Sequence, residues 1–167
     1  MRRKIWAILL LLFIGQVHFI QAENVSMSRN ETFLFLQEAL SAQLSLGDKF
    51  YTENELTEIL TSYFTNDYQQ LFINEHIFAE PEGFILYGTD VFDYFIPMYS
   101  YDDNTKIMTD KNKIIVYEYF LPQLDGSVIW EKPHYESITI IKTNEGWKIS
   151  QYKISEKPPT IDQKSGL

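Results

Sequence analysis

The stretch from Tyr135 to Ile154 reads YESITIIKTNEGWKISQYKI and is central to the predicted fold. Two runs rich in β-branched and aromatic residues, the types that suit a pleated sheet, flank residues 143–146, TNEG. Gly146 can adopt a positive φ at little cost, as a type I turn closed by a G1 bulge requires. The stretch therefore predicts a β-hairpin at the centre of a sheet, with Trp147 substantially buried.

The register of this hairpin depends on the type of turn. A G1 bulge places Ile141 opposite Ile149. A two-residue loop instead places Ile140 opposite Ile149 and Glu136 opposite Lys153. Because a slip of one residue exchanges the two faces of a strand, both registers stay open at this point.

The first 22 residues have the order of a secretory signal peptide. Basic residues 2–4 precede an apolar run over residues 5–14, and Ala22 is the expected residue before the cut. The run is short for a spanning helix of ~20 residues, so cleavage is favoured over an uncleaved anchor. We expect a secreted or extracytoplasmic protein on the cell-envelope side, held at the membrane only if this segment is retained.

Composition excludes several classes of function. The chain has 167 residues, 45% of them hydrophobic, which suffices for one domain with a real core. Without cysteine it can form no disulfide, zinc ribbon, iron–sulfur site or catalytic thiol. Removing residues 1–22 leaves eleven Lys and Arg against 23 Asp and Glu, a net charge of −12. Nucleic acid and anionic lipid are therefore not expected partners.

The order of elements predicts an α+β fold. Helices are expected first: one from about residue 30 with an apolar face of Phe33, Leu36, Leu40 and Leu44, one after the capping box of Thr52 and Glu55, and one after residues 65–67. Strands are expected at 84–87, 113–121 and 128–132, followed by the hairpin. We assign a signal peptide to 1–22, a linker to 23–29, one domain to 30–155 and a disordered tail to 156–167.

This order, ending in the segment 144–149 (NEGWKI), resembles the cystatin-like or nuclear-transport-factor-2-like superfamily. The whole chain is similar to uncharacterised families of small exported Gram-positive proteins. The resemblance covers residues 30–155 and implies a curved, cone-shaped antiparallel sheet packed on the helices, with a pocket at its open end. It implies no single activity, because that superfamily includes isomerases, dehydratases and binding or dimerisation modules.

Acid–base chemistry in such a pocket would need a titratable side chain, and Glu118, His76 and Asp93 are the candidates. Asp90 and His134 are also available. We favour an outward, solvated Glu118, because an unpaired buried Glu is rare. His76 is expected at the surface or at a helix cap, and His134, after a proline, in solvent. The Asp-rich turn at 102–104 fails the calcium-loop pattern, so no metal and no cofactor are expected.

Residues 92–101, FDYFIPMYSY, are the most aromatic part of the chain. Pro97 makes this segment an edge strand or a loop over the core. It either closes the core, with its hydroxyl groups at the surface, or forms a lid or patch that contacts a ligand or partner. Under the second interpretation Tyr94, Tyr99 and Tyr101 are the binding residues, and both interpretations stay open.

Two functions remain. The leading hypothesis is an exported non-enzymatic domain that binds a protein partner or an apolar small ligand at the open end of the sheet. The alternative is a small enzyme of the isomerase or dehydratase kind that uses a pocket carboxylate or His. The two differ in whether a titratable side chain lies deep in a cavity.

Overall fold

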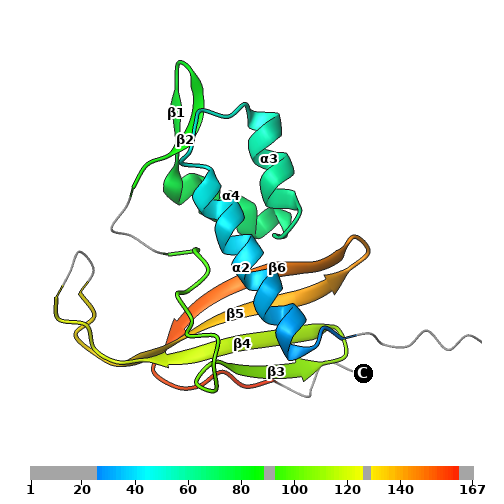
Figure 1. Ribbon diagram of the computed structural model, residues 1–167, viewed down its shortest axis with the longest axis vertical. Coiled ribbons are helices and arrows are strands. Elements are labelled where there is room, and N and C mark those ends of the chain that lie inside the picture. Colours follow the sequence, from blue (N-terminus) through cyan, green and yellow to red (C-terminus); the bar gives the residue numbers. More distant parts are fainter. Residues whose placement is uncertain (1–25, 89–92, 126–128, 162–167) are drawn as a thin grey trace, which may run out of the picture.

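The computed structural model describes residues 26–88, 93–125 and 129–161. The predicted signal peptide, Asp90 and Phe92, and the end of the predicted tail lie outside the described residues. Helices come first and antiparallel strands follow, which confirms the α+β fold (Figure 1). The helices are α2 (Arg29–Ser45), α3 (Glu53–Thr61) and α4 (Asn66–His76). The strands are β1 (Ile77–Glu80), β2 (Gly83–Leu86), β3 (Lys106–Asp110), β4 (Lys113–Phe120), β5 (His134–Thr143) and β6 (Gly146–Ser155).

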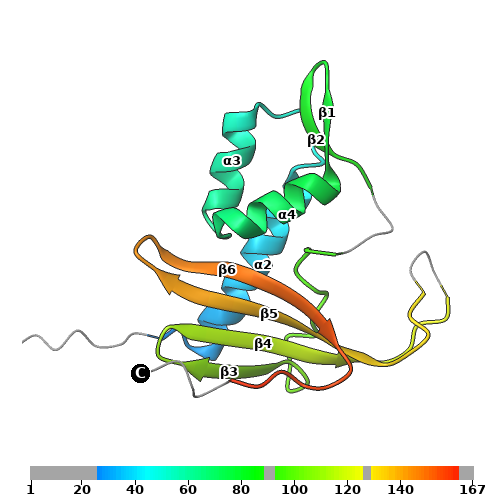
Figure 2. The same cartoon turned by 180° about the vertical axis from the view of Figure 1, so that it is seen from behind.

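The larger sheet is an antiparallel meander in the order β3-β4-β5-β6. Figures 1 and 2 show that α2 crosses one face of this sheet, and that α3 and α4 lie near the β6 edge of the sheet. The core lies between the helices and the sheet. Its most buried side chains include Leu36, Leu60, Phe64, Tyr68, Phe72, Ile114, Ile138, Ile140 and Ile149.

The terminal hairpin forms as predicted, and its register combines two patterns. Near the turn the two-residue loop is correct, because Ile140 pairs with Ile149. A register shift next to Ile140 then adds one residue on β6. Glu136 consequently lies opposite Ile154 rather than Lys153, so that part of the prediction is wrong.

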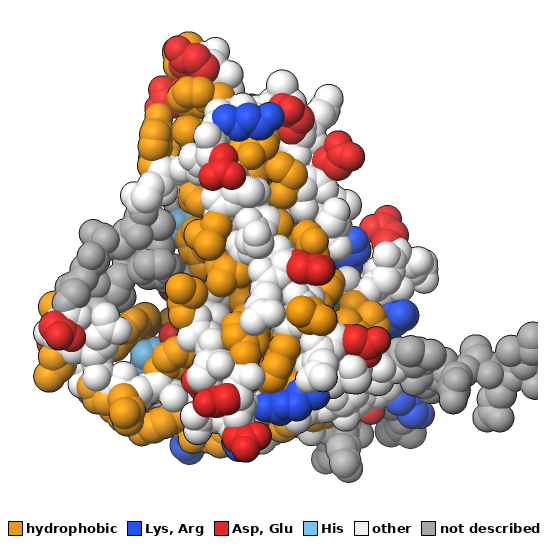
Figure 3. Space-filling view, viewed as in Figure 1, with side chains coloured by type: hydrophobic (Ala, Val, Ile, Leu, Met, Phe, Trp, Pro, Cys, Tyr) orange, Lys and Arg blue, Asp and Glu red, His pale blue; other side chains and the backbone are white. Residues whose placement is uncertain are grey.

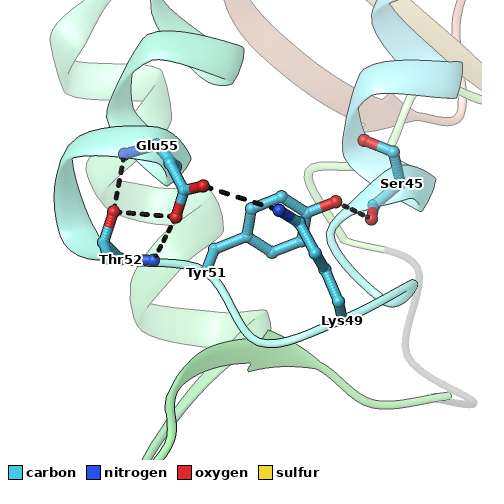
Figure 4. Close-up of polar contacts among 5 residues, drawn as sticks. All are labelled: Ser45, Lys49, Tyr51, Thr52 and Glu55. Atoms are coloured by element: carbon cyan, nitrogen blue, oxygen red, sulfur yellow. Dashed lines mark hydrogen bonds and ion pairs between the residues drawn. The ribbon is translucent and has the colours of Figure 1, made fainter.

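The connection from α2 to α3 is fixed by local polar contacts, which Figure 4 shows. The predicted capping box is present: the Thr52 hydroxyl accepts from the Glu55 amide, and the Glu55 carboxylate accepts from the Thr52 amide. The Tyr51 hydroxyl donates to the Ser45 carbonyl oxygen over 2.8 Å. The Lys49 ammonium lies 4.8 Å from the centre of the Tyr51 ring and 3.5 Å from the Glu55 carboxylate.

The face of α2 that packs on the core differs in part from the predicted one. Phe33 and Leu36 are buried as expected, whereas Leu44 is 53% exposed and that part of the prediction is wrong. Gln43 is buried in its place, because its side-chain amide bonds to the backbone of the loop at 93–101. Hydrophobic periodicity cannot detect a buried amide of this kind.

The β1–β2 hairpin is a separate two-stranded sheet, and β1 was not expected from the sequence. It follows α4 directly and pairs with the short strand expected near residue 84. Phe78 and Tyr87 are 50% and 44% exposed, with ring centres 5.3 Å apart. In Figure 3 hydrophobic side chains gather on this hairpin, while acidic side chains are spread over the visible face.

Residues 93–101 form a loop over the core, one of the two forms expected for them, and the strand predicted at 128–132 differs. In the stretch predicted as a strand at 128–132, the described residues show an isolated bridge between Trp130 and Gln123. All helices of the described residues fall short of the length and hydrophobicity that crossing a bilayer requires.

Candidate functional site

A cavity of about 370 Å³ lies where β4 ends and β5 begins. Residues 95–98 of the loop form one wall, and side chains from β4, β5, β6 and the β4–β5 connection form the other. Most of the lining is apolar. Its apolar side chains include Phe95, Ile96, Met98, Phe120, Leu121 and Trp130.

One side of the cavity is polar and carries His134 and Tyr152, which both bond to Glu136. Glu136 is at the centre: the Tyr152 hydroxyl donates to one of its carboxylate oxygens over 2.9 Å, and His134 Nε2 lies 3.1 Å from the other. The second ring nitrogen of His134, Nδ1, lies 3.3 Å from the Lys132 carbonyl oxygen. Each ring nitrogen of this histidine therefore faces a protein oxygen, and a neutral imidazole can donate to only one of the two.

The strand geometry explains how these side chains meet. His134 and Glu136 are two residues apart on β5 and so project from the same face of the sheet. Tyr152 lies two residues from Ile154, the cross-strand partner of Glu136, which makes it a diagonal neighbour on that face. The register shift on β6 thus determines which β6 side chain reaches the carboxylate.

His134 was expected in solvent, and that expectation is wrong. The side chain is buried, with its ring centre 4.3 Å from that of Trp130 and 5.7 Å from that of Phe120. Phe120 is the cross-strand partner of His134 on β4, and Trp130 lies in the β4–β5 connection. A histidine after a proline looks solvent-exposed in the sequence, whereas strand pairing and the connection bring these rings to it.

Burial and the neighbouring Glu136 carboxylate hold the pKa of Tyr152 well above its ordinary value. The hydroxyl therefore keeps its hydrogen at physiological pH and donates it to Glu136. This hydrogen bond fixes the orientation of the carboxylate at the cavity wall.

The loop that forms the opposite wall is held by buried donors and acceptors from the helices. Gln43 Nε2 donates to the Tyr94 carbonyl oxygen over 2.7 Å, and the Ile96 amide donates to Gln43 Oε1 over 3.0 Å. The Tyr68 hydroxyl donates to the same Tyr94 carbonyl over 2.9 Å. The wall at 95–98 is thus anchored to α2 and α4 rather than to the sheet alone.

The three tyrosines predicted to bind do not lie together on an open surface. Tyr99 is buried and its hydroxyl donates to the Val116 carbonyl oxygen over 3.2 Å, so it belongs to the core. Tyr94 and Tyr101 are partly buried and have positive φ values of 64° and 55°. None of the three is among the described side chains that line the cavity.

Glu118 was expected to face solvent, and this is wrong. It is buried, and one of its carboxylate oxygens accepts from the Ser100 amide at 2.9 Å, the Ser100 hydroxyl at 3.0 Å and the Thr105 hydroxyl at 2.7 Å. These donors replace the water that a buried carboxylate loses. They arrive from a loop that no strand pattern identifies as a partner of β4.

His76 and Asp93 also lie away from the cavity wall. His76 is at the end of α4 as expected, but it is buried between the rings of Phe72 and Phe95, at 5.0 and 4.7 Å. Its Nε2 lies 2.5 Å from the carbonyl oxygen of Asp93. Asp93 therefore contacts His76 through its backbone only, and its side chain is exposed.

The pairing of His134 with Glu136 in the cavity wall was not predicted from the sequence. Their spacing of two within a strand was a usable signal, because it places both side chains on one face. Within residues 26–88, 93–125 and 129–161, no three His, Asp or Glu side chains are grouped so that they could hold a metal ion.

Comparison with known proteins gives one family match. The model of the family described as "Protein of unknown function (DUF3993)" matches residues 28–120. The matched part runs from the N-cap of α2 to the end of β4. No curated protein and no solved structure matches the chain.

Proposed function

Because the chain belongs to the DUF3993 family, whose description names no activity, we propose a function from the cavity itself. The protein is a non-enzymatic domain that binds a small, largely apolar ligand between the 95–98 loop and the end of the sheet. The observation that carries this proposal is an apolar cavity of about 370 Å³ with one compact polar cluster in its wall.

The size and lining agree with this function. Small-molecule sites have volumes of about 300–1,000 Å³, with mostly apolar walls and a few polar groups that orient the ligand. Met98 and Leu121 line the cavity and are 75% and 73% exposed, so apolar surface continues from the cavity to the solvent. Such surface favours an apolar ligand over a strongly hydrated one.

A variant at the exposed part of the cavity tests the proposal. Met98→Trp would place a larger side chain at the cavity, and Leu124→Trp makes the same kind of change at a residue that is 70% exposed and does not line it. We expect isothermal titration with 3-phenylpropan-1-ol to show saturable binding that Met98→Trp weakens and Leu124→Trp leaves unchanged. Equal loss in both variants, or binding only of a protein partner, would contradict a small-ligand site here.

A second candidate, a small isomerase- or dehydratase-like enzyme, is favoured by one observation. Glu136 and His134 line the cavity and bond to each other, so a carboxylate paired with an imidazole lies in the wall beside a bound molecule. Nuclear magnetic resonance of a compound incubated with the protein distinguishes the two functions, because it shows whether the compound is converted. An unchanged compound supports binding, whereas conversion that Glu136→Gln abolishes supports catalysis.

We further propose that the protein is exported and cut after Ala22, as a small exported Gram-positive protein with a cystatin-like or nuclear-transport-factor-2-like domain. The order of basic, apolar and polar residues in 1–22 supports export. Helices followed by an antiparallel meander support the resemblance in fold. N-terminal sequencing of protein from the culture medium tests the cut, and an intact Met1 on cytosolic protein would exclude it.

A further inference from the structure

We infer that the ligand of this cavity carries a protonated amine, and that its ammonium group binds to Glu136. This inference rests on the proposed binding function and specifies the chemical class of the ligand. It follows from which hydrogen-bonding groups at the polar wall are already used and which remain free.

The donors of the polar cluster are already engaged. The Tyr152 hydroxyl hydrogen is directed to Glu136, and the contact of His134 Nε2 with Glu136 requires its hydrogen on that nitrogen. His134 Nδ1 faces the Lys132 carbonyl oxygen. The cluster therefore has no donor left for a ligand.

Acceptor capacity remains at the same place. Each carboxylate oxygen of Glu136 can accept two hydrogen bonds, and each accepts one from the described side chains. The Glu136 side chain is 14% exposed, so it is not sealed from the cavity that it lines. The Tyr152 oxygen, whose hydrogen points to Glu136, can also accept. A ligand group that donates several hydrogen bonds complements this wall.

Charge favours an ammonium over a neutral donor. No lysine or arginine is among the described side chains that line the cavity, whereas a carboxylate is. A carboxylate in an apolar wall gains from an opposite charge, and aromatic rings such as Trp130 and Phe120 attract cations and not anions. The net charge of −9 also favours the approach of a cation. An anionic ligand would meet repulsion from the carboxylate and from the net negative charge.

Three probes of nearly equal size separate these possibilities by isothermal titration: 3-phenylpropan-1-amine, 3-phenylpropan-1-ol and 3-phenylpropanoate. We expect the amine to bind about tenfold more tightly than the alcohol, as a charge-assisted hydrogen bond predicts, and the carboxylate to bind most weakly. This comparison uses the unmodified protein and does not depend on the folding of any variant.

A matched pair of variants then locates the effect. Glu136→Gln should bring the affinity for the amine close to that for the alcohol. Glu131→Gln, an equal change of charge at an exposed residue nearby in the chain, should leave it unchanged. Equal loss in both variants would mean that overall charge, and not contact with Glu136, attracts the amine, which overturns the inference.

The outcomes also separate this inference from the proposed function. If the alcohol and the amine bind equally well, or the carboxylate binds best, the ammonium class is wrong while the cavity remains a binding site. If none of the three probes binds, the proposed binding function fails, and the inference fails with it.

Discussion

Glu118 on β4 and Glu136 on β5 lie directly opposite each other across neighbouring antiparallel strands. Like charges in this position destabilise a sheet unless other groups compensate them. Here each carboxylate has its own donors: Ser100 and Thr105 for Glu118, and a histidine and a tyrosine for Glu136. One carboxylate fixes a loop, and the other lines the cavity.

Removing the carboxylate of Glu118 should therefore destabilise the fold. Glu118→Ala leaves the Thr105 hydroxyl and the Ser100 amide without the acceptor they use, whereas the Ser100 hydroxyl can still donate to Asp102, and we expect a loss of about 3 kcal/mol in the free energy of unfolding. Glu118→Gln keeps one acceptor oxygen and removes the repulsion from Glu136, so its loss should be clearly smaller. Urea unfolding followed by circular dichroism measures both. Equal losses would mean that the negative charge, and not the acceptor, matters.

Lys148 should stabilise the end of α3. It is buried on β6, and its ammonium donates to the carbonyl oxygens of Thr61 and Ser62, where the helix ends. A cation at this end of a helix is favourable. Lys148→Met should cost about 1–3 kcal/mol in urea unfolding. The control Lys153→Met, at an exposed position on the same strand, should change stability by less than about 0.5 kcal/mol. Similar losses in the free energy of unfolding for the two variants would show that Lys148 does not stabilise the end of α3.

The hairpin should depend more on Ile149 than on Trp147. Ile149 is fully buried, whereas Trp147, which was expected to be substantially buried, is only partly buried and lies beside the Lys142 ammonium, 5.1 Å from the centre of its ring. Ile149→Ala should cost about 3–5 kcal/mol. Trp147→Ala should cost about 1–3 kcal/mol, because less of the ring leaves the core. Thermal and urea melts of the two variants check this order, and a larger loss for Trp147→Ala would contradict it.

The protein should lose stability in alkali before all of its tyrosines ionise. Burial raises the pKa of Tyr101 to about 12 and holds those of Tyr68, Tyr99 and Tyr152 well above the ordinary value. An unfolded tyrosine loses its proton near pH ~10. The stability contributed by these neutral phenols is thus complete below that pH and falls as pH rises above it. Tyrosinate absorbance should show that these buried tyrosines ionise at the pH at which circular dichroism shows unfolding. Ionisation of all tyrosines while the protein is still folded would contradict the prediction.

Local signals in the sequence were enough for the α+β order and for much of the helical part. The capping box of Thr52 and Glu55 and the turn at 143–146 involve residues close together in the chain, so spacing and residue type specify them. The predictions failed where a side chain meets a distant partner. Glu118 and His134 were expected in solvent, yet donors and rings from loops cover them.

The fold class, the helix caps and the terminal hairpin could be predicted from the sequence, because these depend on contacts within a few residues. The site could not, because it forms only in the folded protein. The cavity joins the loop at 95–98, the end of β4, the start of β5 and Tyr152 of β6, segments that are far apart in the chain. A single register shift on β6 and the anchoring of the loop by Gln43 bring them together. Hydrophobic periodicity predicts neither the register shift nor the Gln43 hydrogen bonds, because both depend on where the backbone lies after the core has packed.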